Sequence, residues 1–102
     1  MLLEQREVSP KTQLDGKLEI STGTAGRLTS FGDALAVAAG GERAPARIES
    51  MTCTCAKRSG EPHVHHFVAS PILKHLPGGA AVRLELEPES ATLHVHIETK
   101  PT

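Results

Sequence analysis

The chain has 102 residues and a formal net charge of −1, and only 2% of its residues are aromatic. This length predicts a single small domain with a thin aliphatic core, which is marginally stable without further support. The sequence lacks a cluster of Lys and Arg and has few aromatic side chains, which argues against nucleic-acid binding. It also contains no apolar run of the roughly 20 residues that a membrane-spanning helix needs.

Residues 1–16 are mostly polar and contain the breaker pairs Ser9-Pro10 and Asp15-Gly16. We therefore expect residues 1–16 to form a flexible arm, followed by one β-barrel-like domain over residues 17–100. Because the first residues carry charged side chains and lack an apolar signal core, a cytoplasmic protein is predicted. Its two cysteines are then expected to be reduced.

The next segments predict short strands. Residues 17–21 alternate and predict a strand, residues 22–26 predict a turn, and residues 27–30 a short return strand. Residues 34–39 are rich in Ala, but a helix of this length is marginal, so we expect a strand that turns back through Gly40-Gly41.

Residues 46–55 predict a long strand, and residues 63–69 predict its return strand. The apolar residues Ala46 and Ile48 lie on the opposite side of this strand from Cys53, so we expect a β-bulge near Glu49-Ser50. Ser70 followed by Pro71 then predicts the N-terminus of a short helix.

The clearest element is the last hairpin, around residues 88–91. Its expected pairs are Leu86 with Leu93, Leu84 with Val95, and Val82 with Ile97. One face is apolar and the other polar, which is typical of a half-buried antiparallel pair. The order of all these elements predicts a mainly β fold: a small, partly closed antiparallel barrel of five to seven strands with one short helix, with the strand order of OB and SH3-like barrels (β-β-β-α-β-β).

The main chemical signal is a Cys-x-Cys pair followed by a His-x-His pair. A three-residue loop over residues 58–60 would place Cys55 opposite His63 and Cys53 opposite His65, all on one face of a hairpin. Sulfur and imidazole ligands favour zinc over calcium or magnesium. We therefore predict a structural zinc site of Cys53, Cys55, His63 and His65, in which the bound ion supports a thin core.

Two alternatives remain open for this hairpin. A two-residue loop, Ser59-Gly60, would place Cys53 opposite His66 and send the side chains to other faces. The cysteines could also be small buried apolar residues, with the histidines as ordinary surface residues.

A second His-x-His pair lies in the last hairpin. His94 and His96 fall on its polar face, where the expected register places them opposite Glu85 and Arg83. We interpret them as solvated residues with charged neighbours, or alternatively as an auxiliary site of Glu85, His94 and His96 between molecules. His75 is expected to pack against or cap the short helix.

The predicted function is that of a small zinc-binding β domain that acts as a binding or adaptor module for an unidentified protein partner. No membrane contact is expected, and a homo-oligomer is possible. One alternative is a metal-dependent enzyme that uses Cys53, Cys55 and His65 with a bound water and Glu61 as general base. The other is a metal-free structural or assembly protein. No phosphate-binding loop or nucleophile motif occurs in the sequence.

Overall fold

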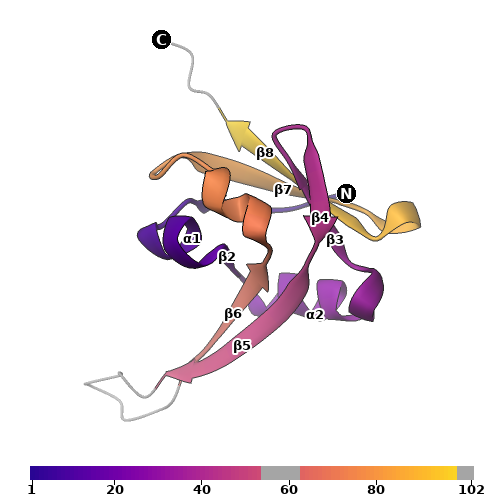
Figure 1. Ribbon diagram of the computed structural model, residues 1–102. Helices are drawn as coiled ribbons and strands as arrows, with labels where there is room; N and C mark the ends of the chain where they lie inside the picture. Colours follow the sequence, from indigo (N-terminus) through magenta and orange to yellow (C-terminus); the bar gives the residue numbers. More distant parts are fainter. Residues whose placement is uncertain (54–62, 99–102) are drawn as a thin grey trace.

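The computed structural model describes residues 1–53 and 63–98. In this part of the chain the strands form two sheets that share one hydrophobic core (Figure 1). The larger sheet has the strand order β1 (Leu2–Glu7), β7 (Ala81–Glu87), β8 (Thr92–Glu98), β3 (Ala36–Ala39) and β4 (Glu42–Pro45). The smaller sheet has the order β2 (Lys17–Ile20), β6 (His63–Ala69) and β5 (Arg47–Cys53). The fold is therefore mainly β, as predicted, but the sheets are not closed, so the predicted barrel is not confirmed.

Two α-helices and three short 3-10 turns connect these strands in the described ranges. They are α1 (Pro10–Asp15), α2 (Thr22–Thr29), η1 (Gly32–Ala34), η2 (Pro71–His75) and η3 (Pro88–Ser90). The short helix predicted after Ser70 is η2, although the Ser70 side chain makes no capping hydrogen bond.

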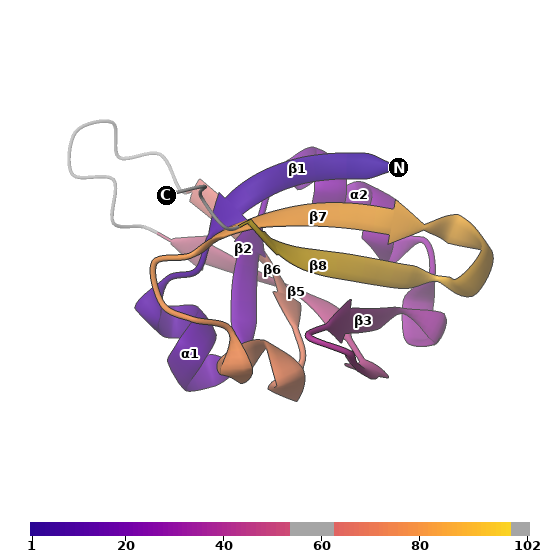
Figure 2. The same cartoon turned by 90° about the horizontal axis from the view of Figure 1, so that it is seen from above.

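The β7–β8 hairpin has the predicted register. Leu86 pairs with Leu93, Leu84 with Val95, and Val82 with Ile97. Alternate residues of β7 are buried, so its Val and Leu side chains enter the core and its charged side chains face away. In Figure 2, β1, β7 and β8 run side by side.

Strand β3 joins the larger sheet in a way that differs from the predicted all-antiparallel fold. It pairs with β8 in the parallel direction and with β4 in the antiparallel direction. The β3–β4 turn is the expected one at Gly40-Gly41, where both residues have positive φ angles of 58° and 82°. Such angles favour glycine and match a tight two-residue hairpin turn.

Residues 1–16, for which we expected a flexible arm, contain two regular elements. They contain β1, which pairs with β7, and α1, which ends at Gly16 in the left-handed conformation. The carboxylate of Glu4 accepts hydrogen bonds from the Ser21 backbone N–H (3.1 Å), from Ser21 Oγ (2.7 Å) and from Thr24 Oγ1. These long-range contacts attach β1 to the start of α2.

Residues 22–29 form helix α2 instead of the predicted turn and return strand. Ser21 is its N-cap and accepts a hydrogen bond from the Thr24 N–H. Ala25 and Leu28 are buried at helical spacing. Burial of this face outweighs the low helix propensity of Gly23 and Gly26, on which the turn prediction rested.

Strands β5 and β6 form a long hairpin that extends away from the rest of the molecule (Figure 1). Its register is continuous from Arg47 to Cys53, so the bulge expected near Glu49-Ser50 is absent from this described strand. Ile48 and Val68 pack in or against the core, whereas Met51 and Val64, further along the hairpin, are exposed. The expected bulge is not needed, because the outer part of the hairpin lies beyond the core and its side chains do not have to face it.

Candidate functional site

The predicted zinc ligands do not pair as expected. Cys53 lies opposite His63, and Met51 lies opposite His65. This register differs by two residues from the predicted pairing of Cys55 with His63. Cys55 and Glu61 lie outside the described residues, and so do the side chains of Cys53 and His63.

The zinc-binding function predicted from this cluster is corrected by the structure. Among the residues it describes, no group of three or more His, Cys, Asp or Glu side chains could hold a metal ion. His65, which was expected to bind zinc, instead places its Nδ1 atom 3.1 Å from Glu19 Oε2 on β2. The alternative of a metal-dependent enzyme requires Cys55 and Glu61, which lie outside the described residues.

His66 also has a partner across the hairpin. Its Nδ1 atom lies 2.7 Å from Ser50 Oγ, and the two residues are directly opposite in the register. The alternative register, in which Cys53 would lie opposite His66, is therefore not the observed one.

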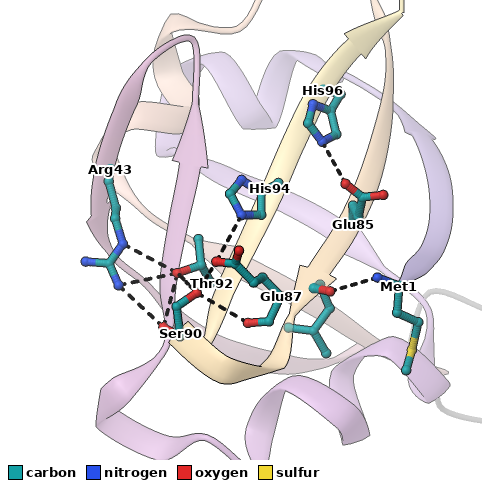
Figure 3. Close-up of polar contacts among 9 residues, drawn as sticks. Met1, Arg43, Glu85, Glu87, Ser90, Thr92, His94 and His96 are labelled. Atoms are coloured by element: carbon teal, nitrogen blue, oxygen red, sulfur yellow. Dashed lines mark hydrogen bonds and ion pairs between the residues drawn. The ribbon is translucent and has the colours of Figure 1, made fainter.

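The structure places a different set of titratable side chains together on the outer face of the larger sheet. Glu85, Glu87, His94 and His96 project from β7 and β8, as Figure 3 shows. We call these four residues the imidazole–carboxylate face. Their side chains are between 34% and 53% exposed, so they are open to a binding partner.

Each histidine of this face is paired with a carboxylate. His94 Nε2 lies 3.6 Å from Glu87 Oε2, and His96 Nε2 lies 3.3 Å from Glu85 Oε1. The backbone register is the predicted one, with Glu85 opposite His94 and Arg83 opposite His96. The side chains nevertheless pair diagonally: His94 contacts Glu87 instead of Glu85, and His96 contacts Glu85 instead of lying beside Arg83 alone.

The two imidazole rings stack on each other. Their centroids are 6.0 Å apart, and their planes differ by 10°. The separation reflects the spacing of alternate residues along one strand. The stacked rings form a ridge along β8, with the carboxylates of β7 on one side.

Glu87 is the most constrained carboxylate of the face. Its pKa lies below the ordinary value of 4.5, chiefly because Ser90 Oγ donates a hydrogen bond to Oε2, with smaller contributions from His94 and Arg43. Arg43 in turn donates hydrogen bonds to Thr92 Oγ1 and to the Ser90 carbonyl oxygen (Figure 3). Glu87 therefore remains ionised in mildly acidic solution.

The way in which Ser90 and His94 contact Glu87 favours binding over catalysis. A serine nucleophile needs a base, usually an imidazole, that accepts its hydroxyl proton. Here Ser90 donates to Glu87 Oε2, and His94 Nε2 lies 3.6 Å from the same oxygen, so both side chains contact the carboxylate and not each other. No imidazole among the described contacts of Ser90 is positioned to activate its hydroxyl.

Two shallow hollows flank the imidazole ridge. One has a volume of about 490 Å³ and is bounded by Met1, residues 85–89 and the two histidines. The other has a volume of about 290 Å³ and lies over β3 and β4, where the small side chain of Ala38 is directly opposite His94. The Met1 amino group, at the edge of the first hollow, donates a hydrogen bond to the Leu86 carbonyl oxygen (Figure 3).

The wider outer face of the larger sheet is acidic. Residues that lie opposite one another in its pairing rows project to the same side. These rows bring together four carboxylates and two guanidinium groups: Glu7, Glu85, Glu87 and Glu98 with Arg43 and Arg83. These six groups together carry an excess of two negative charges.

The sequence indicated part of this site. The alternation of residues 93–97 predicted that His94 and His96 share the polar face, and Glu85 was named as their neighbour. Glu87 and Arg43 were missed as members of the site. For Glu87 a signal existed, because a twisted sheet brings diagonal neighbours within reach of long side chains. For Arg43 no local signal exists, because β4 reaches this face through the parallel pairing of β3 with β8.

Comparison with known proteins identifies no relative: no family model, curated protein or solved structure matches this chain. In the described residues, no helix has the length and apolar character needed to cross a membrane.

Proposed function

We propose that this domain is a protein-binding module whose imidazole–carboxylate face binds a basic segment of a partner protein. The observation that carries the proposal is the acidic excess on the exposed outer face of the larger sheet, which no described helix covers (Figure 3). Opposite charges on two protein surfaces steer association and set the register of binding.

The geometry suits an extended peptide with Lys or Arg side chains. Glu85 and Glu87 are alternate residues of one strand, so their spacing of about 7 Å matches alternate side chains of an extended chain. A guanidinium group can donate two hydrogen bonds to one carboxylate. The hollows beside the histidine ridge provide space for the aliphatic parts of these long side chains. The same negative charge disfavours nucleic acid on this surface.

The experiment that tests this proposal measures binding of a fluorescent oligolysine peptide by anisotropy at neutral pH and low salt. We expect saturable binding that the double variant Glu85→Gln, Glu87→Gln weakens by about tenfold or more, because two charged acceptors are lost. The matched control is Glu19→Gln, since Glu19 is also about half exposed and contacts a histidine, but lies in the other sheet. Equal binding by the two variant proteins, or no saturable binding by the wild type, would refute the proposal.

A further inference from the structure

A second hollow lies on the other sheet, at the end where β2, β5 and β6 meet α1 and η2. Its volume is about 350 Å³, which falls within the usual range of small-molecule sites. The hollow forms across one row of the sheet, in which Ala69 on β6 is directly opposite both Lys17 on β2 and Arg47 on β5. A small side chain between two long cationic ones leaves a recess with basic walls.

Lys74 on η2 supplies a third cation to this recess. The two acids of its lining are Asp15 and Glu49, so the lining carries an excess of one positive charge. Glu49 is already used within the protein, since its two oxygens contact Lys17 Nζ at 2.9 Å and Arg47 Nε at 2.6 Å. Lys74 forms no ion pair in the described part of the chain, and the terminal nitrogens of Arg47 likewise have no described acceptor.

Ser70 gives an independent indication of a missing ligand. It lines the hollow and is only 4% exposed, and its Oγ atom has no hydrogen-bond partner among the described residues. Burying an unpaired hydroxyl is unfavourable, and such groups in native proteins call for an explanation. The Ser70 N–H is also held in place, because it donates to the Gly16 carbonyl oxygen at 2.9 Å.

Gly16 keeps this wall of the hollow closely packed. It has a positive φ of 68°, and a Cβ atom at this position would lie 2.7 Å from the Ser70 carbonyl oxygen. The glycine therefore allows α1 to approach the end of β6, which places Asp15, Lys17 and Ser70 around the same recess.

We infer that this recess, which we call the cationic hollow, binds the phosphoryl group of a small molecule. The ammonium of Lys74 and the guanidinium of Arg47 supply charge-assisted hydrogen bonds to phosphoryl oxygens, and the Ser70 hydroxyl supplies a neutral one. This site lies in the smaller sheet and is independent of the protein-binding face. Its chemistry fits either a phosphate monoester or free phosphate.

The inference is tested by NMR titration of the isotope-labelled protein with inorganic phosphate and with phenyl phosphate, at constant ionic strength. We expect amide shifts around Lys17, Arg47, Ser70 and Lys74 with either probe. Tighter binding of phenyl phosphate would identify a monoester site, and tighter binding of inorganic phosphate a site for the free ion. Shifts equally large with acetate, or no localised shifts with either probe, would overturn the inference.

Three variants separate binding from folding. Lys74→Gln should weaken phosphate binding by about tenfold, as expected for loss of a charged donor. The matched control Lys11→Gln should leave binding unchanged, because Lys11 lies over the Phe67 ring at 5.3 Å and does not line the hollow. Ser70→Ala should weaken binding while leaving the thermal midpoint unchanged or higher, because it removes an unpaired buried hydroxyl. Equal affinity of all three variants would overturn the inference.

Discussion

Glu4 shows how one side chain can attach a whole segment to the fold. Burial by itself would raise its pKa, but hydrogen bonds from Thr24, Ser21 and Arg6 outweigh this effect and hold the pKa below the ordinary value of 4.5. The acceptor is thus an ionised carboxylate that bridges β1 and the N-terminus of α2. The sequence could not indicate this role, because Glu4 and its two helix partners are separated by 17 and 20 positions.

We predict that Glu4→Gln lowers the free energy of unfolding by about 1–3 kcal/mol near neutral pH, since hydrogen bonds to a charged group are lost. The contribution of Glu4 is fully present above pH 4.5, because its folded-state pKa is depressed, and it is lost as the pH falls through that lowered pKa. Urea denaturation at neutral pH and at about pH 3 should therefore show a difference that shrinks in acid. Glu7→Gln, an exposed change on the same strand, serves as the control.

For the β5–β6 hairpin, the two strands were predicted correctly but their register was not. The alternation and the breakers around residues 58–60 predicted both strands, and both are present in the described residues. The register depends on the conformation of the connecting segment, and a shift of two residues preserves the alternation of faces. The sequence pattern therefore could not distinguish Cys53 opposite His63 from Cys53 opposite His65.

The observed register can be tested with cysteine pairs in a background in which Cys53 and Cys55 are replaced by serine. Thr52 and Val64 are directly opposite and exposed, so Thr52→Cys with Val64→Cys should form a disulfide readily. Thr52→Cys with His66→Cys, which would be opposite in the predicted register, is now a diagonal pair and should oxidise slowly. Mass spectrometry after mild oxidation distinguishes the pairs, and faster oxidation of the second pair would show that the register is wrong.

The molecule as a whole consists of two open sheets whose inner faces share one core, while their outer faces carry different chemistry. The outer face of the larger sheet has an excess of carboxylates, whereas the end of the smaller sheet has an excess of cations around a recess. Strand β8 is central to this arrangement, since it is hydrogen-bonded to both β7 and β3.

Leu93 is the residue with which the importance of β8 can be tested. It is fully buried and lies between Leu86 on β7 and Val37 on β3. We expect Leu93→Ala to reduce the free energy of unfolding by about 2–5 kcal/mol, because it leaves a cavity between three strands. Ile97→Ala on the same strand should cost much less, because Ile97 is 42% exposed. Chemical denaturation of both variants measures these changes. An equal loss of unfolding free energy in the two variants would contradict the central role of Leu93.

Local patterns account for what could be predicted. The alternation in β7 and β8, the Gly40-Gly41 turn and the shared face of His94 and His96 depend on residues close together in the chain, where side-chain periodicity is informative. The pairing of β3 with β8, the attachment of β1 through Glu4 and the meeting of Lys17 and Arg47 beside Ala69 required the folded chain. These contacts join distant segments, and their geometry depends on how the core packs, which no short-range pattern encodes.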